Sequence, residues 1–231
     1  MSKAPLMGAF SPKNKVKHFL EFILRRALMK VIGICGSPRV GNTEYYINIV
    51  LGELKKKGFE VELINLRDKN IAQCEGCYKC IENKKCVVAD DFQVVFKKML
   101  KTDGLIVGSP VYNGSITPRL KALLDRSGFS SRWMKNELKT SEGKYDWGQM
   151  PFSRKVFAPI TVARKTGQTF AFAQLALWAA VNDFIMTGSN YWTVGTAGTS
   201  GSVNANEDIE GISIMNHLAE NIDFIVNKLK A

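Results

Sequence analysis

Short apolar runs alternate with amphipathic stretches along most of the chain. The longer runs are rich in Val and Ile and have no polar face, which is typical of strands buried on both sides of a sheet. Residues 59–65 differ, because polar and apolar positions alternate there and favour a strand at the sheet edge. The predicted strands, in chain order, are 30–35, 59–65, 103–109, 155–162 and 191–194.

Between these runs, apolar residues recur at the three- and four-residue spacing of amphipathic helices. Asn42 or Thr43 can cap the first helix, and Lys55 to Gly58 is typical of its carboxyl end. Residues 170–181 are apolar on nearly every side, so we expect both faces of that helix to be covered. The predicted helices lie near 42–57, 91–100, 117–128, 170–181 and 208–230.

Strands that alternate with helices predict a parallel sheet covered on both faces. Right-handed crossovers then give an α/β, doubly wound fold whose ligand crevice lies at the carboxyl ends of the strands. In a flavodoxin-like five-stranded sheet of order 2-1-3-4-5, the loops after strands one, three and four meet at that crevice. All three loops are rich in Gly, Ser, Thr or Asn, so we expect the ligand there.

The loop GSPRVGNT, residues 36–43, has the composition of an anion-binding turn. Backbone N–H groups at a strand–loop–helix junction bind phosphate, and Ser37, Arg39, Asn42 and Thr43 add side-chain donors. The loop lacks both GxxxxGK[ST] and GxGxxG, so it suits a terminal monophosphate better than a dinucleotide. An ordinary turn with a capped helix is the alternative.

Four of the five cysteines form the run C-x2-C-x2-C-x5-C, and three readings of it compete. Consecutive two-residue gaps favour a [4Fe–4S] cluster, whereas a structural zinc site usually has two separated pairs. Disulfides are the third reading, which a cytoplasmic setting argues against. Lys79, Lys84 and Lys85 favour ionised thiolates. The candidate ligands are Cys74, Cys77, Cys80 and Cys86.

The net charge of +11 is unevenly distributed, because seven of the 32 Lys and Arg residues lie within residues 1–30. We interpret residues 1–28 as an N-terminal extension, disordered or read from an upstream start codon, attached to a domain of residues 29–231. A basic amphipathic helix touching a membrane or a neighbouring subunit is the alternative. Residues 128–153 lack a clear period and predict an insertion that serves as a lid or an oligomer contact.

The remaining composition argues against several classes of function. Basic residues do not interleave with aromatic ones on one face, so we expect no nucleic-acid partner. No apolar run is long enough to span a bilayer, and we expect a cytoplasmic protein. His18 and His217 are the two histidines, and we interpret His217 as a surface or packing residue. We therefore name no catalytic acid or base, and we interpret Cys35, at the end of the first strand, as packing.

With these motifs in place, residues 29 to about 229 resemble the iron–sulfur flavoprotein family within the flavodoxin-like NAD(P)H-dependent FMN reductases. The resemblance is carried by the 36–43 loop, the cysteine run, and the segment GSPVYNGSIT at 108–117. It implies that Ser37, Arg39, Asn42 and Thr43 hold the FMN phosphate. It further implies that the isoalloxazine ring and ribityl chain lie along Pro110, Val111, Tyr112, Asn113 and Gly114, with Thr166 and Gly167 at the polar edge of the ring.

The same resemblance implies that the four cysteines ligate a [4Fe–4S] cluster, and that the protein passes electrons between FMN and this cluster. It implies a donor such as ferredoxin or NAD(P)H and a homodimer or homotetramer. Two alternatives stay open, and a third, a receiver domain, is disfavoured. One is an NAD(P)H-dependent FMN or quinone reductase whose cysteines bind zinc or stay free, and another is a redox sensor or electron carrier that does not turn over. A receiver domain would need carboxylates at its strand ends, where this chain has Gly and Ser.

Overall fold

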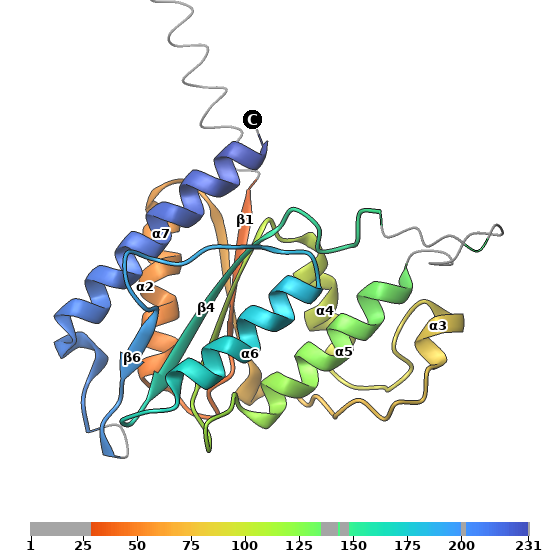
Figure 1. Ribbon diagram of the computed structural model, residues 1–231, viewed down its shortest axis with the longest axis horizontal. Helices are drawn as coiled ribbons and strands as arrows, with labels where there is room; N and C mark the ends of the chain where they lie inside the picture. The colour runs from red at the N-terminus through yellow and green to blue at the C-terminus, as the bar shows by residue number, and fades with distance from the viewer. Residues whose placement is uncertain (1–28, 135–142, 144–147, 200–201, 231) are drawn as a thin grey trace, which may run out of the picture.

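The computed structural model describes residues 29–134, 143, 148–199 and 202–230. Its centre is a parallel sheet of six strands in the order β2-β1-β3-β4-β5, with β6 also paired to β4 (Figure 1). The predicted N-terminal extension, and residues 135–142 and 144–147 of the predicted 128–153 insertion, lie outside the described residues. The strands are β1 (Lys30–Cys35), β2 (Glu60–Asn65), β3 (Gly104–Pro110), β4 (Val156–Ala163), β5 (Ile185–Met186) and β6 (Val194–Thr196).

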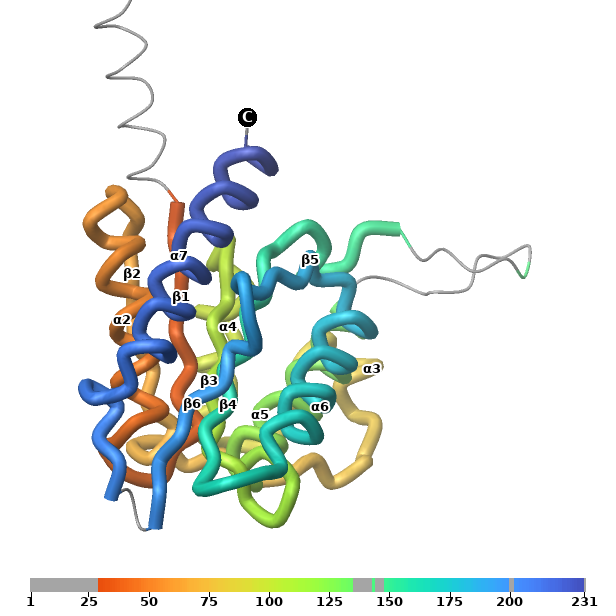
Figure 2. Tube along the Cα trace, turned by 60° about the vertical axis from the view of Figure 1, so that its left-hand side comes forward, coloured from red at the N-terminus to blue at the C-terminus, as the bar shows by residue number. Residues whose placement is uncertain are grey.

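Helices cover both faces of the sheet, as the doubly wound pattern predicts. Figure 2 shows α2 and α7 on one side and α4, α5 and α6 on the other. None of the helices in the described part of the chain is long and apolar enough to cross a bilayer. The helices are α2 (Asn42–Lys56), α3 (Lys79–Asn83), α4 (Phe92–Lys101), α5 (Pro118–Met134), α6 (Gln168–Val181) and α7 (Ile209–Lys230), with short 3₁₀ turns η1 (Leu66–Asp68) and η3 (Ala205–Glu207).

Alternate residues of each buried strand point into two separate cores. In β1, Val31 packs with α2 and α7, whereas Ile32 packs with the helices of the opposite face. Gly108 of β3 lies where α2 comes nearest to the sheet, because a Cβ there would be 2.6 Å from Cδ1 of Ile47. This close approach fixes how the first turn of α2 sits over the ends of β1 and β3.

The predicted fifth strand, residues 191–194, is wrong in its position and its extent. The place beside β4 is filled by two short strands, with Ile185 opposite Val156 and Val194 opposite Thr161. Residues 187–193 connect them. The short apolar run after α6 was missed because two strand residues give too little period to recognise.

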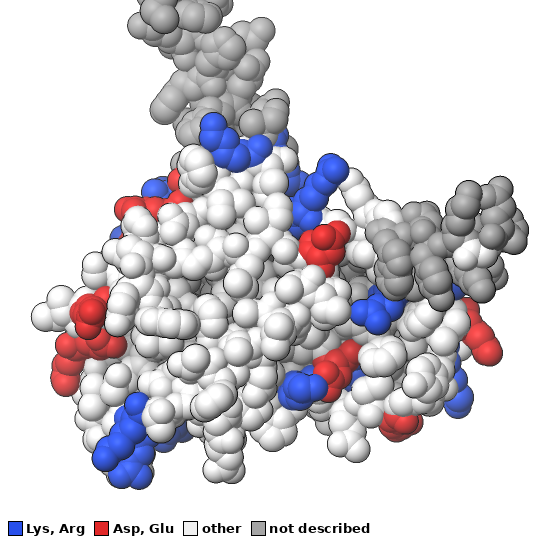
Figure 3. Space-filling model, in the orientation of Figure 1, with Lys and Arg blue, Asp and Glu red and all other residues white. Residues whose placement is uncertain are grey.

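Two of the predicted helices also differ from the structure. Helix α5 continues to Met134, so residues 128–134 belong to it and not to an insertion. Gly128 allows this, because it lies against α6, where a Cβ would be 3.4 Å from Nε1 of Trp178. Helix α6 buries one face only: Phe170, Leu177 and Val181 are exposed, on a surface largely free of charged side chains (Figure 3).

Candidate functional site

The loops that follow β1 and β3 are held together by hydrogen bonds at the carboxyl end of the sheet. The N–H of Gly36 donates to the carbonyl of Gly108 at 2.8 Å, and Oγ1 of Thr117 donates to the carbonyl of Gly36 at 2.8 Å. A Cβ on Gly36 would be 2.9 Å from Cδ2 of Leu120, so α5 comes too near for a larger residue. These contacts therefore fix the positions of the two loops that form the base of the predicted crevice.

A hollow of about 440 Å³ opens beside these loops, within the range of small-molecule sites. The predicted residues that line it are Ser37, Arg39, Asn42, Thr43, Pro110, Val111 and Tyr112. Asn113, Gly114, Thr166 and Gly167 are not among its lining residues. Gly114 and Gly167 nevertheless lie at its margin, since a Cβ on Gly167 would be 3.0 Å from Cγ1 of Val111 and 3.4 Å from Cα of Gly114.

The amino end of α2 faces this hollow. Its N-cap residue is Gly41, which has no side chain to satisfy the first-turn N–H groups, so the prediction of Asn42 or Thr43 as the cap was wrong. Oγ of Ser37 instead shapes the loop, donating to the carbonyl of Arg39 at 2.7 Å. Glu44, the acidic residue of the first turn, is paired with Arg67 at 2.5 Å. These features favour an anion at the helix N-terminus.

Sequence reasoning predicted the loop after β4 at this crevice but missed the side of the hollow formed after β6. The side-chain amide of Asn42 donates to the carbonyls of Thr196 and Val203, and thereby holds the segment after β6 against α2. The Gly- and Ser-rich composition of residues 195–206 was the available signal for this wall. The missed residues include Val162, Ala163, Arg164, Ala197, Gly198 and Asn204.

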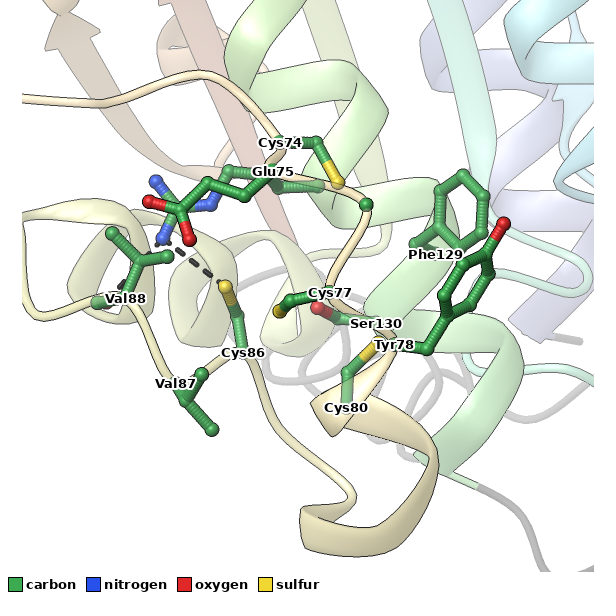
Figure 4. Close-up of a pocket in the computed structure, with 12 residues that line it drawn as sticks. Cys74, Glu75, Cys77, Tyr78, Cys80, Cys86, Val87, Val88, Phe129 and Ser130 are labelled. Carbon is green, nitrogen blue, oxygen red and sulfur yellow. Dashed lines mark hydrogen bonds between the residues drawn. The ribbon is translucent and has the colours of Figure 1, made fainter.

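The cysteine run forms a second hollow, at the side of the molecule where α3 lies (Figure 1). Cys74, Cys77, Cys80 and Cys86 all line it, and Figure 4 shows their sulfur atoms around one space. The enclosed volume is small, about 30 Å³, but Cys74 and Cys77 are exposed, so the space opens to the surface. The structure therefore brings the predicted ligands together.

The backbone of this segment is strained. Tyr78 and Lys84, at the two ends of α3, have φ values of 57° and 55°. These left-handed conformations are unfavourable for residues other than Gly and cluster at functional sites. Gly76 also has a positive φ, which its lack of a Cβ makes easy.

Arg126, which lines the cysteine hollow, forms a buried ion pair with Asp90. The guanidinium of Arg126 donates to both carboxylate oxygens of Asp90, and the two side chains are 1% and 3% exposed. Burial alone raises the pKa of Asp90, but the bonds from Arg126 and from the N–H groups of Ala72 and Phe92 outweigh it, so that pKa lies below its ordinary value. Arg126 also donates to Sγ of Cys86 at 3.3 Å, the contact that a dashed line marks in Figure 4.

The donor set is suited to a thiolate-ligated iron centre, because four thiols face one space. In the described parts of the chain, no three His, Cys, Asp or Glu side chains are close enough to hold a single metal ion as they stand. The sulfur atoms would have to draw inward around a bound group, as is common where metal binding and folding are coupled. Burial raises the pKa of Cys80. The nearby lysines were expected to favour the ionised thiolate, and at Cys80 burial outweighs them.

Two other residues singled out in the sequence lie apart from both hollows. Cys35 is fully buried in β1, and burial raises the pKa of its thiol to about 11. His217 is on α7, with Nδ1 3.0 Å from Oε2 of Glu220. These positions agree with packing for Cys35 and a surface role for His217.

Comparison with known proteins shows which family the chain belongs to. Residues 29–199 match the NADPH-dependent FMN reductase family. An iron–sulfur flavoprotein of Methanocaldococcus jannaschii is 33% identical over 87% of this chain and 100% of its own length. Among solved structures, RosB with a bound riboflavin-phosphate intermediate has a TM-score of 0.67 at 15% identity, covering 87% of this chain and 80% of that one. An archaeal flavodoxin has a TM-score of 0.54 at 13% identity, covering 88% of this chain and 100% of that one.

The chain therefore belongs to the NADPH-dependent FMN reductase family, in its iron–sulfur flavoprotein branch. Its fold is flavodoxin-like, as the strand order predicted. Family membership makes the protein an FMN-dependent oxidoreductase. The particular residues that bind FMN, and the group that the cysteines bind, are taken up below as proposals.

Proposed function

We propose that this oxidoreductase passes electrons between FMN, bound in the hollow of about 440 Å³, and a [4Fe–4S] cluster ligated by Cys74, Cys77, Cys80 and Cys86. Flavin exchanges electrons in pairs or singly, whereas a cluster carries one at a time. The observation that carries the proposal is that all four cysteines of one thirteen-residue run line one hollow in a member of an FMN reductase family.

Each wall of the first hollow has a role in this proposal. Ser37, Arg39, Thr43 and the amino end of α2 hold the FMN phosphate, while Asn42 fixes the wall after β6. The ring and ribityl chain lie along residues 110–114, and Thr166 and Gly167 approach the polar edge of the ring. The electron donor is NAD(P)H or a small carrier such as ferredoxin. A cytoplasmic location and a homodimer or homotetramer stay predictions.

One observation favours a second candidate, an NAD(P)H-dependent FMN or quinone reductase without a cluster. The thiol groups do not form a metal site as they stand within the described residues. In this alternative the cysteines bind zinc or remain free thiols, and the flavin reacts directly with its acceptor.

Metal and flavin analysis separates the two candidates. Protein purified without oxygen, or reconstituted with iron and sulfide, is assayed for iron, zinc, sulfide and FMN. We expect roughly four iron and four sulfide per chain. Cys77→Ala should lose iron and keep FMN, whereas the control Cys35→Ala should keep both. FMN with no iron under either condition would overturn the cluster proposal and leave the second candidate.

A further inference from the structure

Arg126 joins the cysteine hollow to a buried carboxylate. Its Nη1 donates to Oδ2 of Asp90 at 2.5 Å, and its Nη2 donates to Oδ1 at 3.0 Å. The same Nη2 donates to Sγ of Cys86 at 3.3 Å. One guanidinium thus contacts both a fixed negative charge and a candidate cluster ligand.

The Arg126 side of this contact is shielded from water. The Arg126 side chain is 1% exposed, and its guanidinium carbon lies 4.2 Å from the centre of the Phe92 ring. Nη1 also donates to the carbonyl of Ala72 at 3.0 Å, which fixes the group in place. Charges act more strongly in such a site than at the surface.

Arg126 also has one N–H group, at Nε, that makes no hydrogen bond within the described residues. It is one of the residues lining the cysteine hollow, and its buried Nε–H has no hydrogen-bond partner in the described part of the chain. A permanently charged side chain with a spare donor is unusual in a purely structural role, because buried donors are normally satisfied.

We propose that Arg126 is a positioning residue that fixes Cys86 as a ligand and raises the reduction potential of the cluster, with Asp90 limiting the rise. The inference rests on the proposed function. Reduction transfers one electron from reduced flavin to the cluster, whose charge becomes more negative by one. A charged donor to a ligand sulfur stabilises that reduced form more than the oxidised one.

Three variants separate this effect from simple damage to the fold. Arg126→Met combined with Asp90→Asn removes donor and carboxylate together, so that no buried charge is left unpaired. Asp90→Asn alone keeps the donor but removes the negative charge. The control is Arg119→Gln, which changes an exposed arginine of the same helix that donates to the carbonyls of Leu66 and Arg67.

The measurement is a redox titration of cluster-loaded protein, with the FMN couple of the same sample as internal reference. At a fixed potential, the double variant should lower the ratio of reduced to oxidised cluster about tenfold, or about 59 mV for a one-electron couple. Asp90→Asn should raise that ratio. Arg119→Gln should leave it unchanged, and the FMN couple should not move in any variant.

Opposite shifts in the two variants would support the inference, because loss of stability cannot produce both. An unchanged cluster potential in variants that retain cluster would overturn it, as would a loss of cluster with the remaining fraction at the wild-type potential, which would make Arg126 merely structural. A wild-type protein that takes up no iron or sulfide would instead defeat the proposed function itself.

Discussion

The side-chain amide of Asn42 bridges two segments that are 161 residues apart, donating to the carbonyl of Val203 at 2.7 Å. The same amide donates to the carbonyl of Thr196 at 3.1 Å. Asn42 is the first residue of α2, so these bonds join the helix that faces the candidate phosphate site to the wall formed after β6. The hollow proposed for FMN depends on this link for its shape.

Asn42→Ala should weaken FMN binding by up to about thirtyfold. The two lost hydrogen bonds are worth about 1 kcal/mol each, or about 2 kcal/mol together, and each 1.4 kcal/mol corresponds to about a factor of ten in affinity. Titration of flavin-free protein with FMN, followed by quenching of flavin fluorescence, measures the change. Asn48→Ala, at an exposed position of the same helix, is the matched control. Equal losses in the two variants would contradict the assigned role.

Arg39→Ala should reduce the preference of the protein for FMN over riboflavin by about tenfold, because a charge-assisted bond to phosphate is absent with riboflavin. The affinity for riboflavin itself should change little. Lys165→Ala removes an exposed cation next in sequence to Arg164, which lines the hollow, and serves as the control. If Arg39→Ala weakened both flavins equally, the phosphate would have to lie elsewhere.

Gly108→Ala should destabilise the fold by about 1–3 kcal/mol, because the new methyl group would overlap Ile47 of α2. Gly52→Ala is its counterpart, since nothing lies within 4 Å of a Cβ there and Ala favours the helix by about 1 kcal/mol. Urea unfolding of the two variants measures both effects. Similar stabilities would contradict the close contact between α2 and β3.

The buried thiol of Cys35 should make the stability of the fold fall at alkaline pH. Its pKa is raised to about 11 by burial, whereas an unfolded Cys titrates near pH ~8.5. The raised pKa means that its contribution to stability is complete below ~8.5 and is lost as the pH rises toward 11. Urea unfolding should therefore show a loss of about 2 kcal/mol between pH 8.5 and pH 10 from this residue.

Cys35→Ser is the control for this pH effect, because serine does not titrate in the same range. The other four cysteines are the same in both proteins and contribute equally. The variant should lose less stability than the wild type over the same interval. An identical pH dependence would show that Cys35 does not contribute to it.

Much of the fold was predictable because its long strands and helices carry strong periods. The runs at 30–35 and 103–109 need only local pattern and the handedness of crossovers to give the sheet order. The split edge strand was not predictable, since Ile185 and Met186 are paired through β4 and not by their own pattern. The extent of α5 depended similarly on the contact of Gly128 with α6.

The candidate sites divide in the same way. Contiguous motifs, the 36–43 loop and the cysteine run, were found from spacing and residue type. Asn204 was missed because it reaches the hollow proposed for FMN only through the folding of a distant segment. Arg164 was not named although it lies in the loop after β4, which the sequence did place at the crevice. The ion pair between Arg126 and Asp90 likewise joins two residues 36 positions apart, and no short-range sequence pattern predicts it.

The most direct test of the account counts the electrons that one chain accepts. Protein loaded with FMN, iron and sulfide is titrated without oxygen with a calibrated reductant, while flavin absorbance and the paramagnetic signal of the reduced cluster are recorded. We expect about three electrons per chain, two for the flavin and one for the cluster, with both signals changing in the same sample. An uptake of about two electrons, confined to the flavin, would contradict it.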